Sequence, residues 1–444
     1  MDTQLNRERS LNRSKNFMYP VYLTFILIIG SIFLSFYIPY ASVLGLIVGT
    51  LFVLKYDIKS SYYLLFALYP FAFIFKLGSI STSLFTMLEY LAIAKSLINR
   101  RYVNIKYFLL VAPFLLISLV SGVVTGNLGL VSVVKVSLNL AVFYIYINYY
   151  YESDDLTDIG YSMVVGMMAS NLMGLLKFRI PGFMAMYNDL NITYINWGVR
   201  VRRFCGTFTD PNFYSIATIV TLGIIICLFL NKKGNLFFAI SAIALILFGI
   251  TTYSKSFFLM LILLIMFILA VLMRKGRVLA LIFIAIGIIY ILQSGILMKN
   301  TYVSAIIGRF TGDYEDLTTG RTSIWDSYYG YIKSDFRRWL IGEGCGAPYY
   351  IGASHNTYLE TWYYVGFLGL LSFLFMWFGT LLTNKLIRHK LMNWYLVAFV
   401  ALQFFFLDGF RTAELPFYMI CGWIALNTEI IRPNSQEEIQ SDQG

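Results

Sequence analysis

Long apolar segments alternate with short polar connections along almost the whole chain. A helix needs roughly 20 apolar residues to cross a bilayer, so about 14 segments predict membrane-spanning helices, or about 12 without the two shortest. The two shortest are residues 41–54 and 82–98. All of the segments together are 18–37, 41–54, 61–76, 82–98, 107–125, 130–150, 159–177, 212–230, 235–251, 255–273, 277–293, 356–382, 393–408 and 413–430. The pattern predicts an all-α, polytopic integral membrane protein.

Composition agrees with this class. Of the 444 residues, 59% are hydrophobic and only 13% are charged, whereas soluble domains carry about 25% charged residues. In a membrane protein the net charge of +11 is first of all an orientation signal, distributed loop by loop. We therefore expect the lipid bilayer as a partner and no nucleic acid.

Basic residues mark every second connection between the predicted spans. Because cytoplasmic loops carry an excess of lysine and arginine, these connections predict a cytoplasmic side that also contains the basic N-terminus 1–17 and the polar tail 431–444. The acidic connection 151–158 falls on the same side. The basic positions are Lys55, Lys59, Arg100, Arg101, Lys106, Lys232, Lys233, Arg274, Lys275, Arg277, Lys385, Arg388 and Lys390.

This orientation leaves two long connections on the outer face. They are residues 178–211 and 294–354, and they separate an N-terminal transmembrane half (18–177) from helices at 212–293 and at 355–430. The remaining outer connections are tight turns. Since functional residues concentrate on loops held by a rigid scaffold, we expect any site in the two long connections.

The first long connection ends in a basic and polar cluster. Arg202 and Arg203 carry guanidinium groups that suit phosphate or diphosphate, although a solvated basic loop is the alternative. Asp210 and Pro211 fit the N-cap and the first position of a helix, and a helix N-terminus also favours an anion. Asn212 is an unexpected residue where the chain enters lipid.

The second long connection predicts a surface helix and a glycine-rich turn. Ile324, Tyr328 and Tyr331 have helical spacing, which indicates an amphipathic helix on the membrane surface with Arg321 at its start. The segment "GEGCGAP", residues 342–348, is rich in turn residues and can approach a ligand closely.

The stretch "ASHNTYLETW" opens the next apolar helix with polar residues. Thr357 and Glu360 fit a capping box, but His355 and Asn356 precede it. Histidine is the side chain best suited to take a proton near neutral pH. Lys255, near the outer end of another helix, either snorkels to the interface or faces a shared pocket.

Metal and disulfide signals are weak. Asp313 and Glu315 form a single D-x-E pair, which suits a metal but is more often a solvated acidic loop, and no His/Cys cluster has metal-ligand spacing. We therefore expect no metal and no other cofactor. Cys205 and Cys345 lie in the two outer connections, so a disulfide between them is a hypothesis for an oxidising compartment.

Several blocks in a fixed order resemble the bacterial O-antigen polymerase and O-antigen ligase superfamily. They are Arg203-x-x-Gly206 with "FTDPN", then "YSKS", "GRTSIW", "LIGEGCG" and "SHNTYLETWYYVGFLGLL". The last block contains the family's His-Asn, its acidic helix start and its Gly-x-x-Gly, here Gly366 and Gly369. The family often has arginine at the position of Lys255. The similarity covers about residues 200 to 380, and the N-terminal half is similar in hydropathy only.

The resemblance implies a GT-C-like, metal-independent glycosyltransferase of the bacterial inner (cytoplasmic) membrane. Its donor and acceptor would be undecaprenyl-diphosphate-linked oligosaccharides at the periplasmic face, and a chain-length regulator protein is a candidate partner. The implied activity is that of an O-antigen or capsular polysaccharide polymerase. An O-antigen ligase is the first alternative. A flippase for lipid-linked oligosaccharides is the second, and few ionisable residues in the spans argue against it.

The resemblance also implies roles for the candidate residues. His355 would be the base that deprotonates the acceptor hydroxyl, or would position it, while Arg203 and Arg321 would bind the diphosphate. The residues expected to shape the substrate site are Arg202, Asp210, Asn212, Lys255, Asn356 and Glu360.

Overall fold

The computed structural model describes most of the chain between residues 2 and 383. The described ranges are 2–38, 40–77, 83–99, 105–129, 155–179, 193–196, 199–274 and 320–383, with short pieces between 134 and 150 and between 401 and 420. The predicted span 277–293, most of 393–408 and 413–430, the Asp313/Glu315 pair and the tail 431–444 lie outside these residues.

The described elements are helices and one β-hairpin. The first half contains α1 (Asp2–Leu34), α2 (Ser42–Lys55), α3 (Ile58–Leu68), η1 (Tyr69–Phe71), α4 (Leu84–Asn99), α5 (Ile105–Thr125), α7 (Leu156–Leu176) and η3 (Lys177–Arg179). The second half contains β1 (Thr193–Asn196), β2 (Val199–Arg202), α10 (Pro211–Leu230), α11 (Leu236–Ile250), α12 (Lys255–Arg274), α17 (Arg321–Lys333), α18 (Phe336–Ile341) and α19 (Thr357–Thr383). The predicted helical class is confirmed except at this hairpin.

Three stretches of described helix are long and apolar enough to cross a membrane. They are Leu156–Leu176, Pro211–Leu230 and Thr357–Trp377. Shorter apolar helical stretches occur at Met18–Leu34, Ser42–Lys55, Leu109–Thr125, Leu236–Ile250 and Lys255–Leu269. These helices suit a membrane protein, and the total of about 14 spans stays a prediction.

The predicted span 61–76 is wrong as one continuous helix. Helix α3 ends at Leu68, and a single 3-10 turn carries the chain to Phe71. Pro70 lies in that turn, and proline removes a backbone donor and disfavours continuation of a helix. The chain then extends to Lys76, which forms an antiparallel bridge with Ser83.

One end of the bundle, here called the lysine end, collects the connections predicted to be cytoplasmic. Lys59 Nζ lies 3.3 Å from Asp155 Oδ1, so the acidic connection before α7 faces the lysine-bearing connection before α3. Asn235, in the α10–α11 connection, donates to Tyr161 Oη in the first turns of α7 at 2.6 Å. The acidic connection, which is the exception to the charge pattern, therefore contacts a lysine-bearing connection at this end.

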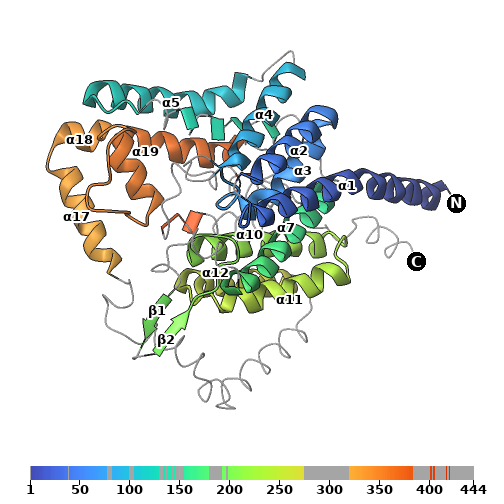
Figure 1. Cartoon of the computed structure of the whole chain (residues 1–444). Helices are drawn as coiled ribbons and strands as arrows, with labels where there is room; N and C mark the ends of the chain where they lie inside the picture. Colours follow the sequence, from blue (N-terminus) through green and yellow to red (C-terminus); the bar gives the residue numbers. More distant parts are fainter. Residues whose placement is uncertain are drawn as a thin grey trace, which may run out of the picture.

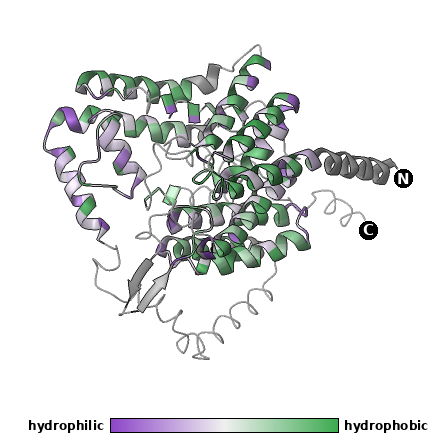
Figure 2. Ribbon diagram, in the orientation of Figure 1, coloured by the Kyte–Doolittle hydropathy of each residue, from purple (hydrophilic) through white to green (hydrophobic). Residues whose placement is uncertain are grey.

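The opposite end, here called the loop end, carries α17, α18 and the hairpin. Figure 1 shows these elements at the end of the molecule away from the N-terminus of α1. The chain after α5 joins them, because Asn127 Nδ2 donates to the carbonyl of Glu343 at 2.9 Å. In Figure 2 hydrophilic residues gather on α17 and α18, whereas the helices between the two ends are mainly hydrophobic. Parts of both long connections therefore share one end.

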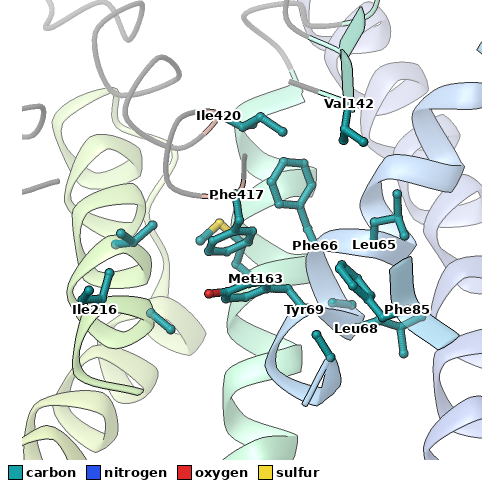
Figure 3. Packing of buried hydrophobic residues seen from close by; sticks show 14 of the residues in the cluster. Leu65, Phe66, Leu68, Tyr69, Phe85, Val142, Met163, Ile216, Phe417 and Ile420 are labelled. Carbon is teal, nitrogen blue, oxygen red and sulfur yellow. The ribbon is translucent and has the colours of Figure 1, made fainter. Parts of the chain in front are cut away.

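A stack of aromatic rings ties the first long connection to the core. Tyr69 lies flat on Phe417, with ring centroids 3.6 Å apart and planes 7° from parallel (Figure 3). Phe208, from the first connection, meets the edge of Tyr69 at 5.9 Å. Tyr69 and Phe208 are fully buried and Phe417 nearly so. Burial of such rings is a large apolar contribution, and here it holds the chain just before α10.

Candidate functional site

The first long connection folds into the end of the bundle. After the antiparallel pair β1 and β2, residues 205–208 are buried. The amide of Thr207 donates to Ser170 Oγ of α7 at 3.0 Å, and its hydroxyl donates to the carbonyl of Pro70. Gly206 has φ +53°, and a Cβ there would lie 2.5 Å from Ser170 Oγ. The segment is therefore an inserted part of the fold.

The hairpin is a feature that the sequence prediction missed. Valine and arginine alternate at Val199, Arg200, Val201 and Arg202, and alternation of this kind is a strand signal. Each strand has only four residues, so the alternation is short and is easily overlooked beside long apolar helices. Arg202 is the last residue of β2, paired with Thr193, and it leads directly into Arg203.

Helix α10 begins as the sequence predicted. Asp210 has extended backbone angles, and its Oδ1 accepts from the amide of Asn212 at 2.6 Å. Pro211 is the first helical residue. A capping carboxylate here satisfies one of the amides that a helix start leaves without a partner.

Arg203, Asn212, Thr252 and Ser254 form one hydrogen-bonded group, here called the arginine cluster. Arg203 Nε donates to the carbonyl of Thr252 at 2.8 Å, and its Nη2 donates to Asn212 Oδ1 at 3.3 Å. Ser254 Oγ donates to the same amide oxygen at 2.9 Å. This explains Asn212 at the start of an apolar helix, because its side chain joins the guanidinium to the α11–α12 connection.

Lys255 follows the arginine cluster directly. It is the first residue of α12 and is half-buried. Its neighbours Ser254 and Ser256 share a hydrogen bond between their hydroxyls at 2.8 Å. Among the predicted residues of the first region, Arg203 and Asp210 each form a hydrogen bond with Asn212, and Lys255 follows Ser254 of the cluster in the chain.

Cys205 contacts a buried lysine. Lys177 Nζ donates to Cys205 Sγ at 2.9 Å, and both side chains are fully buried. Burial raises the pKa of the Cys205 thiol, and the nearby charge of Lys177 opposes the rise.

The hypothesis of a disulfide between Cys205 and Cys345 is wrong, because neither cysteine forms a disulfide and both are buried. Cys205 is held beside Lys177 at the end of α7. Cys345 follows Gly344, whose amide donates to the carbonyl of Tyr364 in α19 at 2.8 Å. Each thiol is thereby fixed in the packing of its own helices.

Residues 354–356 form a tight turn, here called the histidine turn. Ser354 Oγ donates to the carbonyl of Asn356 at 3.0 Å and accepts from its amide at 3.1 Å. His355, between them, has φ 52° and is half-buried. Left-handed backbone is uncommon outside glycine, and the hydrogen bonds of Ser354 hold it here. The backbone that carries the imidazole is therefore fixed.

The predicted capping box at Thr357 is wrong. Asn356 caps α19, since its Oδ1 accepts from the amide of Leu359 at 3.0 Å. Thr357 is already the first helical residue, and its amide donates to the carbonyl of Phe404 at 2.7 Å. Glu360 lies in the first turn and is buried, with 2% of its surface exposed. Asn356 thus has a structural role that the sequence reading assigned to Thr357.

Helix α17 begins at Arg321 and contacts the histidine turn. Arg321 is its first residue, as predicted, after Gly320 at φ 71°. Trp325 Nε1 donates to the carbonyl of Ser354 at 2.8 Å, and Tyr328 Oη donates to the carbonyl of Gly352 at 2.6 Å. The predicted helical spacing is confirmed, and its buried face packs on the chain that leads into α19.

The glycine-rich turn approaches protein backbone closely. The amide of Glu343 donates to the carbonyl of Tyr363 at 2.9 Å. Gly342 and Gly366 have positive φ, and a Cβ on either would collide with the backbone of the other segment. Gly366 also interrupts the helical angles of α19. These glycines are explained by the packing of the turn on a kinked helix, where the sequence suggested approach to a ligand.

A half-buried ion pair beside this turn was also missed. Arg338 Nε lies 2.5 Å from Glu343 Oε1, and its guanidinium lies 3.8 Å from the centre of the Tyr331 ring. Tyr331 Oη donates to the same carboxylate at 3.2 Å. Burial and then the charge of Glu343 raise the pKa of Tyr331. Side-chain pairs on a helix lie three or four residues apart, and Glu343 follows the end of α18, so the sequence offered no spacing signal for this pair.

An open groove lies between α17 and α19, next to the histidine turn. Its volume is about 380 Å³. Its walls combine aromatic rings with apolar and polar side chains, which are Trp325, Asp326, Tyr329, Asn356, Tyr358, Leu359, Trp362 and Leu370.

The predicted site residues fall into two neighbourhoods. The arginine cluster with Asp210 and Lys255 forms one, and the histidine turn with Glu360 and the start of α17 forms the other. The hydrogen bonds described above each lie within one of the two neighbourhoods, in the described ranges 199–274 and 320–383. In the same ranges there is no group of three His, Cys, Asp or Glu residues that could hold a metal.

Comparison with known proteins gives no relative. No protein-family model matches the chain, and no curated protein matches it. The resemblance to the O-antigen polymerase and ligase superfamily therefore stays a hypothesis that rests on the short sequence blocks.

Proposed function

We propose that this protein is a membrane glycosyltransferase that polymerises O-antigen or capsular polysaccharide. It would move a growing glycan from undecaprenyl diphosphate to a hydroxyl of a lipid-linked repeat unit at the periplasmic face of the inner membrane. The observation that carries the proposal is the pair of polar neighbourhoods, the arginine cluster and the histidine turn, both in segments predicted to be outside.

The arginine cluster suits the leaving group. Transfer breaks the bond between the anomeric carbon and the diphosphate, so negative charge develops on the diphosphate. A guanidinium whose direction is fixed by Thr252 and Asn212 can stabilise that charge without reorganising. The N-terminus of α10, capped by Asp210, adds a partial positive charge. Arg202, Arg321 and Lys255 are proposed to add cationic contacts.

The histidine turn suits the acceptor. A diphosphate leaves without being protonated, so the main requirement is to take the proton from the attacking hydroxyl, or to hold that hydroxyl in place. His355 has the chemistry for either step. Asn356 and Glu360 would shape the same site from the first turn of α19, where Asn356 also caps the helix.

Deletion of the gene in the source organism tests the proposal. Loss of a polymerase leaves surface lipid that carries one repeat unit, which gel analysis of the extracted glycolipid detects. Polymer stranded on its lipid carrier would indicate a ligase, and repeat units trapped at the cytoplasmic face would indicate a flippase. Either of these two outcomes contradicts the polymerase.

A further inference from the structure

We propose that the groove between α17 and α19 is a carbohydrate subsite, which binds a sugar ring of the acceptor beside His355. The acceptor role rests on the proposed function. The groove itself follows from the described residues, with Trp325, Asp326 and Tyr329 contributed by α17 and Tyr358 and Trp362 by α19.

The two tryptophan rings are fixed in orientation. Trp325 Nε1 donates to the carbonyl of Ser354 at 2.8 Å, and Trp362 Nε1 donates to the carbonyl of Trp339 at 3.0 Å. Each indole N–H is thus engaged by the backbone, so a ligand would meet a preformed surface. Preorganisation lowers the entropic cost of binding.

A tyrosine completes an aromatic corner. The ring of Tyr329 lies 5.8 Å from that of Trp362, at 66° between the planes. Lys333 Nζ lies 4.3 Å from the centre of the Tyr329 ring, which keeps that exposed ring in place. The electron-rich faces of such rings suit the weakly positive C–H groups of a sugar.

Polar groups on the groove favour a sugar over a lipid chain. The exposed carboxylate of Asp326 and the amide of Asn356 both line it, and such groups hydrogen-bond hydroxyls. The volume of about 380 Å³ is in the range of small-molecule pockets, roughly 300–1,000 Å³. An acyl or prenyl chain has no group that could form a hydrogen bond with Asp326.

The groove is joined to the proposed acceptor chemistry by one residue. Trp325 lines the groove and also holds the carbonyl of Ser354, the residue before His355. A sugar bound against Trp325 would therefore lie next to the turn that presents the imidazole. This placement is what an acceptor subsite requires, since the hydroxyl must come within hydrogen-bond reach of the base.

Saturation-transfer NMR on the purified protein tests the subsite. The probe is the single repeat unit released by mild acid from its undecaprenyl diphosphate carrier, free of lipid and phosphate, in a detergent without a sugar head group. Irradiation of the aromatic protons should saturate the sugar C–H protons. Tyr329→Ala removes a ring that is 42% exposed and should weaken binding roughly 10-fold.

Tyr350→Ala is the matched control, because Tyr350 is 43% exposed and does not line the groove. It should bind the repeat unit as the wild type does. No saturation in the wild type, or equal weakening by the two variants, would overturn the proposal. If undecaprenyl phosphate bound the groove and the sugar protons showed no saturation, the groove would be a lipid site. That result would also overturn the proposal.

A third variant separates this inference from the proposed function. His355→Ala should lose chain extension, whereas saturation of the sugar C–H protons should persist because the aromatic rings that line the groove are intact. A wild-type protein that binds the repeat unit but extends no chain would refute the polymerase and leave a carbohydrate site. A wild-type protein that extends chains, but whose groove shows no contact with the repeat unit, would refute only the proposed subsite.

Discussion

The arginine cluster and the histidine turn are built in opposite ways. Arg203 is held by Thr252 and Asn212, which come from two different parts of the chain. His355 is held by its immediate neighbours, Ser354 and Asn356. The first geometry exists only when α10, α11 and α12 are packed, whereas the second is closed by hydrogen bonds between Ser354 and Asn356 and is contacted by Trp325 of α17. Substitutions should therefore act differently in the two places.

Within the arginine cluster, the largest effect is expected at Arg203. Arg203→Lys keeps the charge, but one ammonium cannot reproduce the guanidinium fork that contacts both Thr252 and Asn212. We expect chain extension by purified protein to fall roughly 100-fold, comparable to the loss of one charge-stabilising donor. Arg337→Lys, on the exposed side of α18, is the control. A wild-type rate for Arg203→Lys would show that the fork is not used.

A smaller effect is expected at Ser254, in the same cluster. Ser254→Ala removes one of the two donors to Asn212 Oδ1 and leaves the other, Arg203, in place. The loss of one such hydrogen bond is about 1 kcal/mol, so the extension rate should fall roughly 5-fold. Steady-state rates of the purified variant measure this. A loss as large as that of Arg203→Lys would mean that the hydroxyl itself contacts substrate.

The local turn gives a stability effect that distinguishes the two capping assignments. Asn356→Ala removes the acceptor of the Leu359 amide and should lower the free energy of unfolding by about 1 kcal/mol. Asn356→Ser should restore most of it. Thermal unfolding in detergent measures both. If Thr357→Ala were the more destabilising change, the capping box predicted from the sequence would be correct after all.

The smallest effect concerns a second local cap, at the start of α18. The amides of Arg338 and Arg337 hold the pKa of the Asp335 carboxyl below its usual value. The cap therefore contributes fully above the unfolded pKa of about 3.9 and is lost as the pH falls through the lower folded value. Carboxyl NMR titration checks this. A value at or above that of an unfolded aspartate would contradict the cap.

What the sequence could predict follows the same division. The Asp210–Pro211 helix start and the start of α17 at Arg321 depend on local chemistry, and both were predicted. The hydrogen bond from Arg203 to Thr252, and the insertion of Thr207 between η1 and α7, depend on elements distant in sequence. Periodicity carries no information about such packing.

Local rules also failed where a distant residue intervened. Thr357 fits a capping box, but Phe404 accepts its amide and Asn356 takes the cap. The cysteines lie in two outer segments, yet Cys205 lies beside Lys177, and Cys345 follows a glycine whose amide donates to the backbone of Tyr364. Pro70 ends α3 early, although the hydropathy of 61–76 is continuous. The missed hairpin is a different case, since its alternation was visible.

The central claim is that His355 acts on the acceptor in a chain-extending glycosyltransferase. The most direct measurement is extension of a purified lipid-linked repeat unit by the reconstituted protein, for the wild type, His355→Ala and His355→Asn. Asparagine tolerates the left-handed backbone of this position, so the Asn variant separates backbone geometry from the imidazole. We predict polymer from the wild type and at least about 100-fold slower extension by both variants. Wild-type rates in both variants, or no polymer from the wild type, would contradict the account.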